Sequence, residues 1–179
     1  MASILIDLPP PIYEAVLKHL LPPNAHDEEA AFLFVRDDIG VADRTMALLE
    51  WIPVERAGFA YQSAGYLELA DEVRPEVIKR AHDLGACIVE MHSHPSPWPA
   101  AFSPTDLAGL EEFVPHVRWR LKRRPYVAIV MAPSGFDALA WTDESGKPEP
   151  ISGLLVAGNL LRPSGITFAH RLSAEVADE

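Results

Sequence analysis

Residues 86–95 read Ala-Cys-Ile-Val-Glu-Met-His-Ser-His-Pro, and Ser-Pro-Thr-Asp follows at residues 103–106. The apolar part of the first stretch has the length of a buried strand. His92 and His94 stand two positions apart at the end of that strand, so their side chains point to the same side. With Asp106 they make two imidazoles and one carboxylate, the ligand set of an open zinc site that leaves a fourth position for water.

The spacing from Ser103 to Asp106 also has a purely structural interpretation. Ser-x-x-Asp resembles a capping box, in which Ser103 is the N-cap of a helix and the acid stands at the third helical position. Taken alone, the spacing favours the cap, because such boxes are common. The order of strand, His-Ser-His-Pro, eight-residue loop, Ser-x-x-Asp and helix is more specific than any of its parts.

The segments outside this stretch predict a mixed α and β chain. We expect strands at residues 3–8 (at a sheet edge), 30–35, 45–54, 65–69, 126–131 and 136–141, and turns at 37–40 and 132–135. We expect helices that begin at Pro10-Pro11, Arg74 and Ser103, and that end at Pro22-Pro23, Gly85 and Pro115. This order lacks the regular βαβ alternation of a parallel sheet, so the predicted class is α+β.

Composition narrows the function classes. The chain has 179 residues, 49% of them hydrophobic and 23% charged, which predicts a single soluble domain over residues 1–179. A C-terminal tail from about residue 165 is the candidate flexible segment. No apolar run approaches about 18 residues, and the N-terminus does not have the pattern of a signal peptide, so we expect no membrane segment.

The net charge and the cysteine content indicate which partners and which cellular location to expect. The net charge of −11 disfavours nucleic acid and anionic membranes as partners, because both require Lys and Arg to neutralise phosphate. Cys87 is the sole cysteine, so no internal disulfide forms and the expected location is cytoplasmic. Its parity in the strand is opposite to that of His92, which predicts a buried apolar role rather than a ligand.

The whole pattern resembles the JAMM/MPN+ zinc metallopeptidases, also called JAB domains, and is most like the compact bacterial JAB deconjugases of ubiquitin-like systems. That family shows an upstream Glu, then His-Ser/Thr-His-Pro, then Ser-x-x-Asp at the start of a helix, and the resemblance runs from the helix at Pro11 to the strand that ends at Trp141. It implies an MPN/JAB fold, similar to the cytidine deaminase-like architecture, with a central mixed sheet and flanking helices. The family usually has seven residues between the second His and the Ser, whereas this chain has eight.

The resemblance also implies roles for individual residues. His92, His94 and Asp106 would bind one Zn²⁺ per chain, and Ser103 would help to hold the oxyanion. An upstream glutamate would act as general base and acid. The family's Glu lies three residues ahead of a small residue that begins an apolar run; Glu28 fits that position if Ala31 is the small residue.

Two other acids compete for a place at the site. Glu29 is the alternative to Glu28, and only one of the two can point inward because side chains alternate along a strand. Glu90 lies on the same side of its strand as His92, so it either stands beside the site or faces solvent.

The implied function is a zinc-dependent metallo-isopeptidase or peptidase. It would cleave a ubiquitin-like protein from its conjugates or trim its C-terminus, with the extended C-terminal tail adding as a strand beside the site. E1- and E2-like proteins are the associated partners that the resemblance suggests. The alternatives are a zinc hydrolase acting on a small amide or thioester, and a non-catalytic MPN scaffold module.

Two aromatic segments complete the predictions. In the loop over residues 95–102, we expect Trp98 and Phe102 to pack beneath the loop and hold Asp106 in place; alternatively, Trp98 forms one wall of the substrate groove. Residues 118–124 are basic, with one aromatic side chain. On an acidic chain they predict a solvated strand with Trp119 packed inward, rather than a nucleic-acid site.

Overall fold

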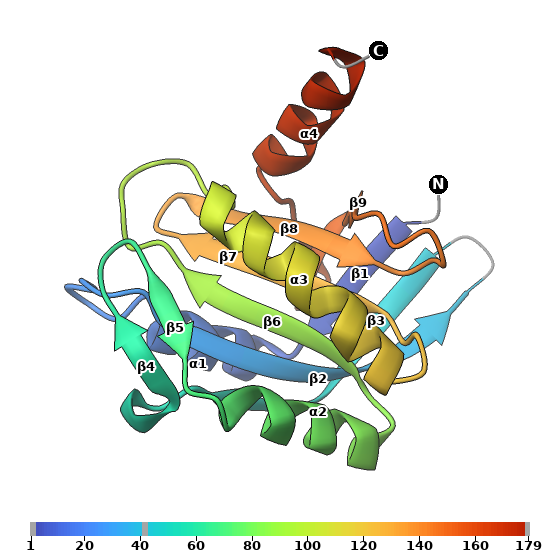
Figure 1. Cartoon of the computed structure of the whole chain (residues 1–179), viewed down its shortest axis with the longest axis horizontal. Helices are drawn as coiled ribbons and strands as arrows, with labels where there is room; N and C mark the ends of the chain where they lie inside the picture. The colour runs from blue at the N-terminus through green and yellow to red at the C-terminus, as the bar shows by residue number, and fades with distance from the viewer. Residues whose placement is uncertain (1–2, 41–42, 178–179) are drawn as a thin grey trace.

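The chain forms one large mixed sheet with helices on both faces (Figure 1). The structure is a computed structural model and describes residues 3–40 and 43–177. The strands of the main sheet are β1 (Ser3–Leu8), β2 (Ala30–Ile39), β3 (Asp43–Pro53), β6 (Cys87–Ser93), β7 (Tyr126–Ala132), β8 (Gly135–Trp141), β9 (Glu149–Pro150), β10 (Gly153–Val156) and β11 (Asn159–Leu161). β4 (Phe59–Gln62) and β5 (Leu67–Leu69) form a separate antiparallel pair. The helices are α1 (Pro10–Leu20), α2 (Val73–Leu84), α3 (Pro104–Arg120) and α4 (Ile166–Ala177), with a 3₁₀ turn at Arg56–Gly58. This arrangement confirms the predicted α+β class.

The strands lie in the order β11-β10-β1-β3-β2-β6-β7-β8-β9. β2 is antiparallel to both β3 and β6, β6 is parallel to β7, and β7 and β8 form the expected hairpin. The prediction that residues 3–8 form an edge strand is wrong, because β1 lies between β3 and β10 and is parallel to both. The strand that covers this edge comes from far along the chain, so local alternation could not reveal it.

Alternating side chains divide the core between the two faces of the sheet. In β2, Leu33 and Val35 join the cluster that includes residues of α1, whereas Phe32 and Phe34 join the cluster that includes residues of α2 and α3. Figure 1 shows α2 and α3 in front of the sheet and α1 behind it. β6 alternates in the same way, and its even-numbered residues, His92 among them, therefore face the side of the sheet that α3 covers.

Two predicted boundaries differ from the structure. Residues 37–39 were expected in a turn, but they continue β2 in register with β3, and the ion pair between Arg44 and Asp37 (3.2 Å) lies across the two strands. Pro115 does not end α3, which continues to Arg120. Proline is tolerated there because its side of the helix is exposed, while the next turn buries Val117 against the core. Gly85 ends α2 as predicted, in the left-handed conformation with φ of 65°.

The basic run over residues 118–124 is not a strand, which corrects the prediction. It is the last turn of α3 and the loop that follows, and the side chain of Trp119 is 72% exposed rather than packed inward. Helical periodicity explains the difference, because Val117 and Leu121 occupy the buried face and leave Trp119 on the other one. Arg118 is buried and donates a hydrogen bond to the carbonyl of Asp143 (2.7 Å).

Cys87 is buried in the core and forms no disulfide, as predicted. Within the residues that the structure describes, none of the helices combines the length and the apolar character that crossing a membrane requires.

Candidate metal centre

His92 and His94 come together at the end of β6. The two Nε2 atoms lie 3.2 Å apart, and the ring planes meet edge to face at 68°. His92 is buried, whereas His94 is partly exposed. The backbone N–H of His94 donates to the carbonyl of Met131 on β7 (2.8 Å), so the chain keeps its strand-like course just beyond β6 and both rings stay on one side.

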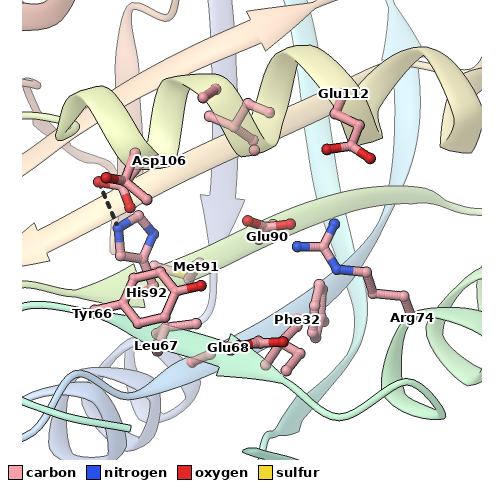
Figure 2. Close-up of a pocket in the computed structure, with 16 residues that line it drawn as sticks. Phe32, Tyr66, Leu67, Glu68, Arg74, Glu90, Met91, His92, Asp106 and Glu112 are labelled. Carbon is pink, nitrogen blue, oxygen red and sulfur yellow. Dashed lines mark ion pairs between the residues drawn. The ribbon is translucent and has the colours of Figure 1, made fainter. Parts of the chain in front are cut away.

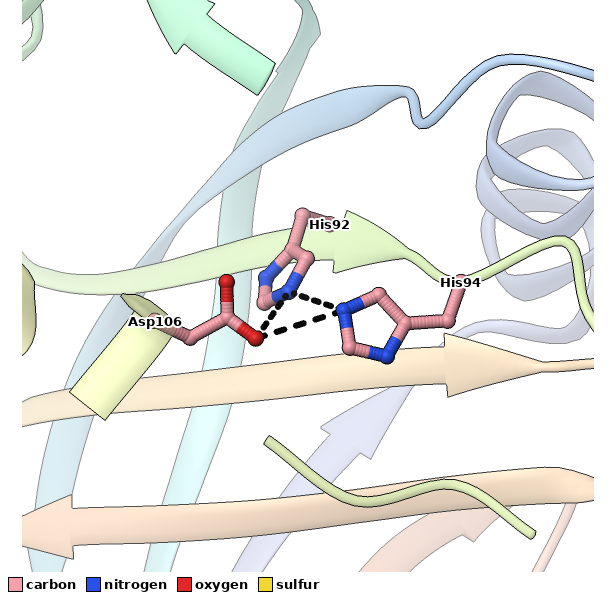
Figure 3. A group of neighbouring side chains, drawn as sticks. All are labelled: His92, His94 and Asp106. Atoms are coloured by element: carbon pink, nitrogen blue, oxygen red, sulfur yellow. Dashed lines mark hydrogen bonds and ion pairs between the residues drawn. The ribbon is translucent and has the colours of Figure 1, made fainter. Parts of the chain in front are cut away.

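Asp106 reaches the histidines from the first turn of α3. Ser103 is the N-cap: its Oγ accepts from the Asp106 N–H (3.1 Å), and its own N–H donates to Asp106 Oδ2 (2.7 Å). The same Oδ2 lies 3.4 Å from His92 Nε2 and 3.3 Å from His94 Nε2 (Figure 3). The capping box and the shared site are therefore both present, because the cap fixes the carboxylate where the rings meet. These three residues can hold a metal ion.

Glu28 is the acid that the structure brings to this group. It precedes β2, its side chain is buried, and its Oε1 lies 3.6 Å from His94 Nε2. Its backbone is held at both ends, since its N–H donates to the Ser63 carbonyl (2.8 Å) and its carbonyl accepts from Gln62 Nε2 (2.7 Å). Glu29 does not join the group; its carboxylate has His19 and Gln62 as neighbours.

Burial and hydrogen bonding drive the pKa values of the two carboxylates apart. Burial acts to raise the pKa of Asp106, but hydrogen bonds from His92 and His94 outweigh it and hold that pKa far below its usual range. Burial raises the pKa of Glu28, and the nearby histidines offset this only in part. Asp106 is therefore suited to remain ionised as a ligand, while Glu28 is suited to exchange a proton.

Burial also acts to lower the pKa of His92, yet hydrogen bonding to Asp106 outweighs it and the net shift is upward.

Glu90 is not part of the group. Its side chain lies on the α3 side of the sheet and accepts a hydrogen bond from the hydroxyl of buried Tyr126. Of the two placements predicted for Glu90, the structure thus favours the one beside the site.

A pocket of about 380 Å³ opens from the metal group. It runs between β5 and α3, from His92 and Asp106 at one end to Arg74 and Glu112 at the other (Figure 2). The residues from Tyr66 to Leu69 form one wall, and within the described residues β5 pairs with β4 alone. An elongated groove beside a strand with an unpaired side can accept an extended peptide.

The loop over residues 95–102 packs differently from the prediction. Phe102 is buried, with its ring centroid 5.8 Å from that of His92, as expected. Trp98 does not pack beneath the loop: its side chain is 73% exposed, and its carbonyl accepts a hydrogen bond from Ser134 Oγ (3.3 Å). The three prolines at positions 95, 97 and 99 favour an extended loop that turns this indole outward.

Gln62 and Tyr126 were not predicted as residues of the site, although Gln62 contacts Glu28 and Tyr126 contacts Glu90. Gln62 fixes the backbone of Glu28, and Tyr126 fixes the carboxylate of Glu90. Each contact joins segments more than 30 positions apart, so no local pattern could have identified it.

No protein-family model and no curated protein matches this chain. One solved structure similar to it is the solution structure of a protein from Salinibacter ruber (strain DSM 13855). The two chains are 17% identical and superpose with a TM-score of 0.42, over 88% of this chain and 91% of the other.

Proposed function

We propose that this chain is a zinc-dependent metallopeptidase of the JAMM/MPN+ type, with the MPN/JAB fold that the sequence resembles. The observation that carries the proposal is the convergence of His92, His94 and Asp106 with Glu28 beside them. Two imidazole nitrogens and one carboxylate oxygen are typical ligands of catalytic zinc. A tetrahedral zinc ion with bonds of about 2.0–2.1 Å separates its ligand atoms by about 3.3 Å. The three separations here are 3.2, 3.3 and 3.4 Å, so this chain's residues fit the ion.

Zinc held by these residues would act as a Lewis acid on the substrate carbonyl and lower the pKa of a coordinated water molecule to about 7. Glu28 would accept a proton from the attacking water and deliver it to the leaving amine. Its burial keeps this exchange out of bulk solvent. The Oγ of Ser103 already accepts the Asp106 N–H, so its own proton is available to the carbonyl oxygen as negative charge develops there.

The groove between β5 and α3 supports an extended peptide as substrate. Its long shape and the unpaired side of β5 suit a C-terminal tail better than a compact small molecule. With the resemblance to bacterial JAB deconjugases, this favours a ubiquitin-like protein as the partner, either in isopeptide conjugates or with a C-terminal extension. E1- and E2-like proteins and a cytoplasmic location belong to the same proposal.

The test is cleavage of a ubiquitin-like domain fused through its C-terminal tail to a reporter, by protein reconstituted with one equivalent of Zn²⁺. We expect cleavage at the end of the tail, its loss after chelation and its recovery when Zn²⁺ is restored. The Glu28→Gln protein is the matched control, because it keeps all three metal ligands. Zinc binding without cleavage of any fusion or conjugate would contradict the peptidase, and would favour a hydrolase of small amides or thioesters or a scaffold module.

A further inference from the structure

Ser164, just before α4, and Thr167, in the first turn of α4, hold the loop over residues 95–102 at two points. Ser164 Oγ donates to the carbonyl of Ala100 (2.6 Å), and the N–H of Phe102 donates to Thr167 Oγ1 (3.0 Å). Ala100, Phe102 and Thr167 are all buried. Because these loop groups lie away from solvent, each needs a protein partner, and the C-terminal segment supplies it.

Asp137 on β8 fixes that segment in turn. Its side chain is fully buried, with one oxygen accepting from the N–H of Gly165 (3.1 Å) and the other from the N–H of Thr167 (2.9 Å). The first oxygen also accepts from the N–H of Ala138 (3.0 Å). The amides at 165 and 167 lie at the start of α4, where backbone donors have no partner within the helix and a carboxylate is favourable.

Phe102 connects this network to the metal ligands. Its ring lies against the imidazole of His92, with 5.8 Å between the ring centroids. The next residue is Ser103, whose N–H holds Asp106 Oδ2. An unbroken series of contacts therefore leads from Asp137 through Thr167 and Phe102 to two of the three candidate ligands.

We propose that Thr167 and Asp137 are positioning residues of the metal centre, and that the start of α4 sets where Asp106 and His92 stand. The middle of the loop is exposed over residues 97–99, where Ser134 Oγ donates to the Trp98 carbonyl (3.3 Å), whereas the end of the loop next to α3 is buried and is held by the C-terminal segment. The attachments at Ala100 and Phe102 lie immediately before the cap. They determine where α3 begins, and with it the position of Oδ2. This inference rests on the metal site of the proposed function.

The test is metal affinity in the full chain, measured with Co²⁺ and Zn²⁺ by competition against a chromophoric chelator. Thr167→Val keeps the shape of the side chain but removes the acceptor of the Phe102 N–H. We expect metal affinity to fall about 10–100-fold, the usual effect of losing a partner that orients a ligand. The visible spectrum of the Co²⁺ form should change as well. Thr167→Ser keeps the hydroxyl and should restore both readouts.

Ser173→Ala is the matched control, since it removes a hydroxyl of α4 that donates within the helix, to the carbonyl of Ala169 (3.1 Å). It should bind metal like the wild type. If Thr167→Val fails to fold, Ser164→Ala removes the other attachment and should shift affinity in the same direction. Wild-type affinity and spectrum in Thr167→Val or, if that variant does not fold, in Ser164→Ala would overturn this inference alone. A wild-type chain that takes up neither ion would overturn the proposed metal centre, and this inference with it.

Discussion

Oε1 of Glu28 lies 3.6 Å from Nε2 of His94, across the junction between β2 and β6. The pairing of Ala30 with His92 in these antiparallel strands produces this approach, because Glu28 and His94 each lie two residues beyond that pair. Register alone therefore decides which of the two neighbouring glutamates enters the site. The acid that does so is buried beside a candidate ligand without being one of the three ligands.

Glu28→Gln should abolish turnover while folding and zinc content stay at wild-type levels. The amide keeps the shape of the side chain but cannot carry the proton, so kcat should fall about 10²–10⁴-fold. Glu29→Gln is the matched control and should have little effect, since that side chain lies near His19 instead. The measurement is kcat together with zinc per chain. If Glu28→Gln is active and Glu29→Gln is inactive, Glu29 carries the proton and the assignment of this role to Glu28 is wrong.

Zinc content should depend on His94. The wild-type protein should hold close to one zinc per chain by elemental analysis, and His94→Ala should hold far less, because one of three converging ligand atoms is gone. His82→Ala removes an exposed imidazole on α2 and should leave zinc unchanged. Equal zinc in His94→Ala and wild type would contradict the ligand assignment.

Cys87 should be unreactive in the folded protein. Burial raises the pKa of its thiol to about 12, and only the thiolate reacts with alkylating reagents. At pH 8, iodoacetamide should therefore modify the native chain very slowly and the denatured chain rapidly, as read by intact mass.

The raised pKa of the Cys87 thiol also makes the free energy of unfolding depend on pH. The contribution of the buried, protonated thiol to this free energy is fully present below the thiol pKa of the unfolded chain, about 8.5. Stability should then decline as the pH rises from there towards 12, and Cys87→Ala should reduce that alkaline decline.

The local parts of the site were predictable, and the long-range parts were not. Strand parity places His92 and His94 on one side, and Ser103 with Asp106 is a local capping pattern, so the sequence was enough to predict this group. The choice of Glu28 over Glu29 depends on the register of β2, which the sequence supported only through resemblance. Thr167 was not predicted, because its contact with Phe102 spans 65 positions.

In the fold, too, local features were predictable and long-range pairings were not. The short apolar run over residues 30–35 and the glycine after α2 are local signals, and the structure confirms both elements. The interior position of β1 arises from pairing with β10, which no local pattern reports. Pro115 and Trp119 were misassigned for a related reason, since packing of the neighbouring turns against the sheet overrides the propensity of a single residue.

Pro115→Ala should stabilise the protein. Proline inside a helix removes one backbone hydrogen bond and costs about 3 kcal/mol relative to alanine in a helix interior. Pro115 is exposed, so replacing it leaves no cavity, and the free energy of unfolding should rise by about 1–3 kcal/mol in urea titrations. His116→Ala, at the next exposed position, should change it by less than about 1 kcal/mol. A loss of stability in Pro115→Ala would mean that the ring makes contacts that outweigh its cost to the helix.

Trp98→Ala should leave both the metal centre and substrate capture undisturbed. An indole that is 73% exposed does not support Asp106, and the hydrogen bond from Ser134 goes to the Trp98 carbonyl, which alanine retains. Zinc affinity, kcat and KM should therefore all stay near their wild-type values, because Trp98 is also absent from the residues that line the groove between β5 and α3. Trp119→Ala is the control, because that indole is 72% exposed at the opposite end of α3 from Asp106. A fall in zinc affinity and kcat together would restore the anchoring role for Trp98, whereas a rise in KM alone would make its indole a wall of the substrate site.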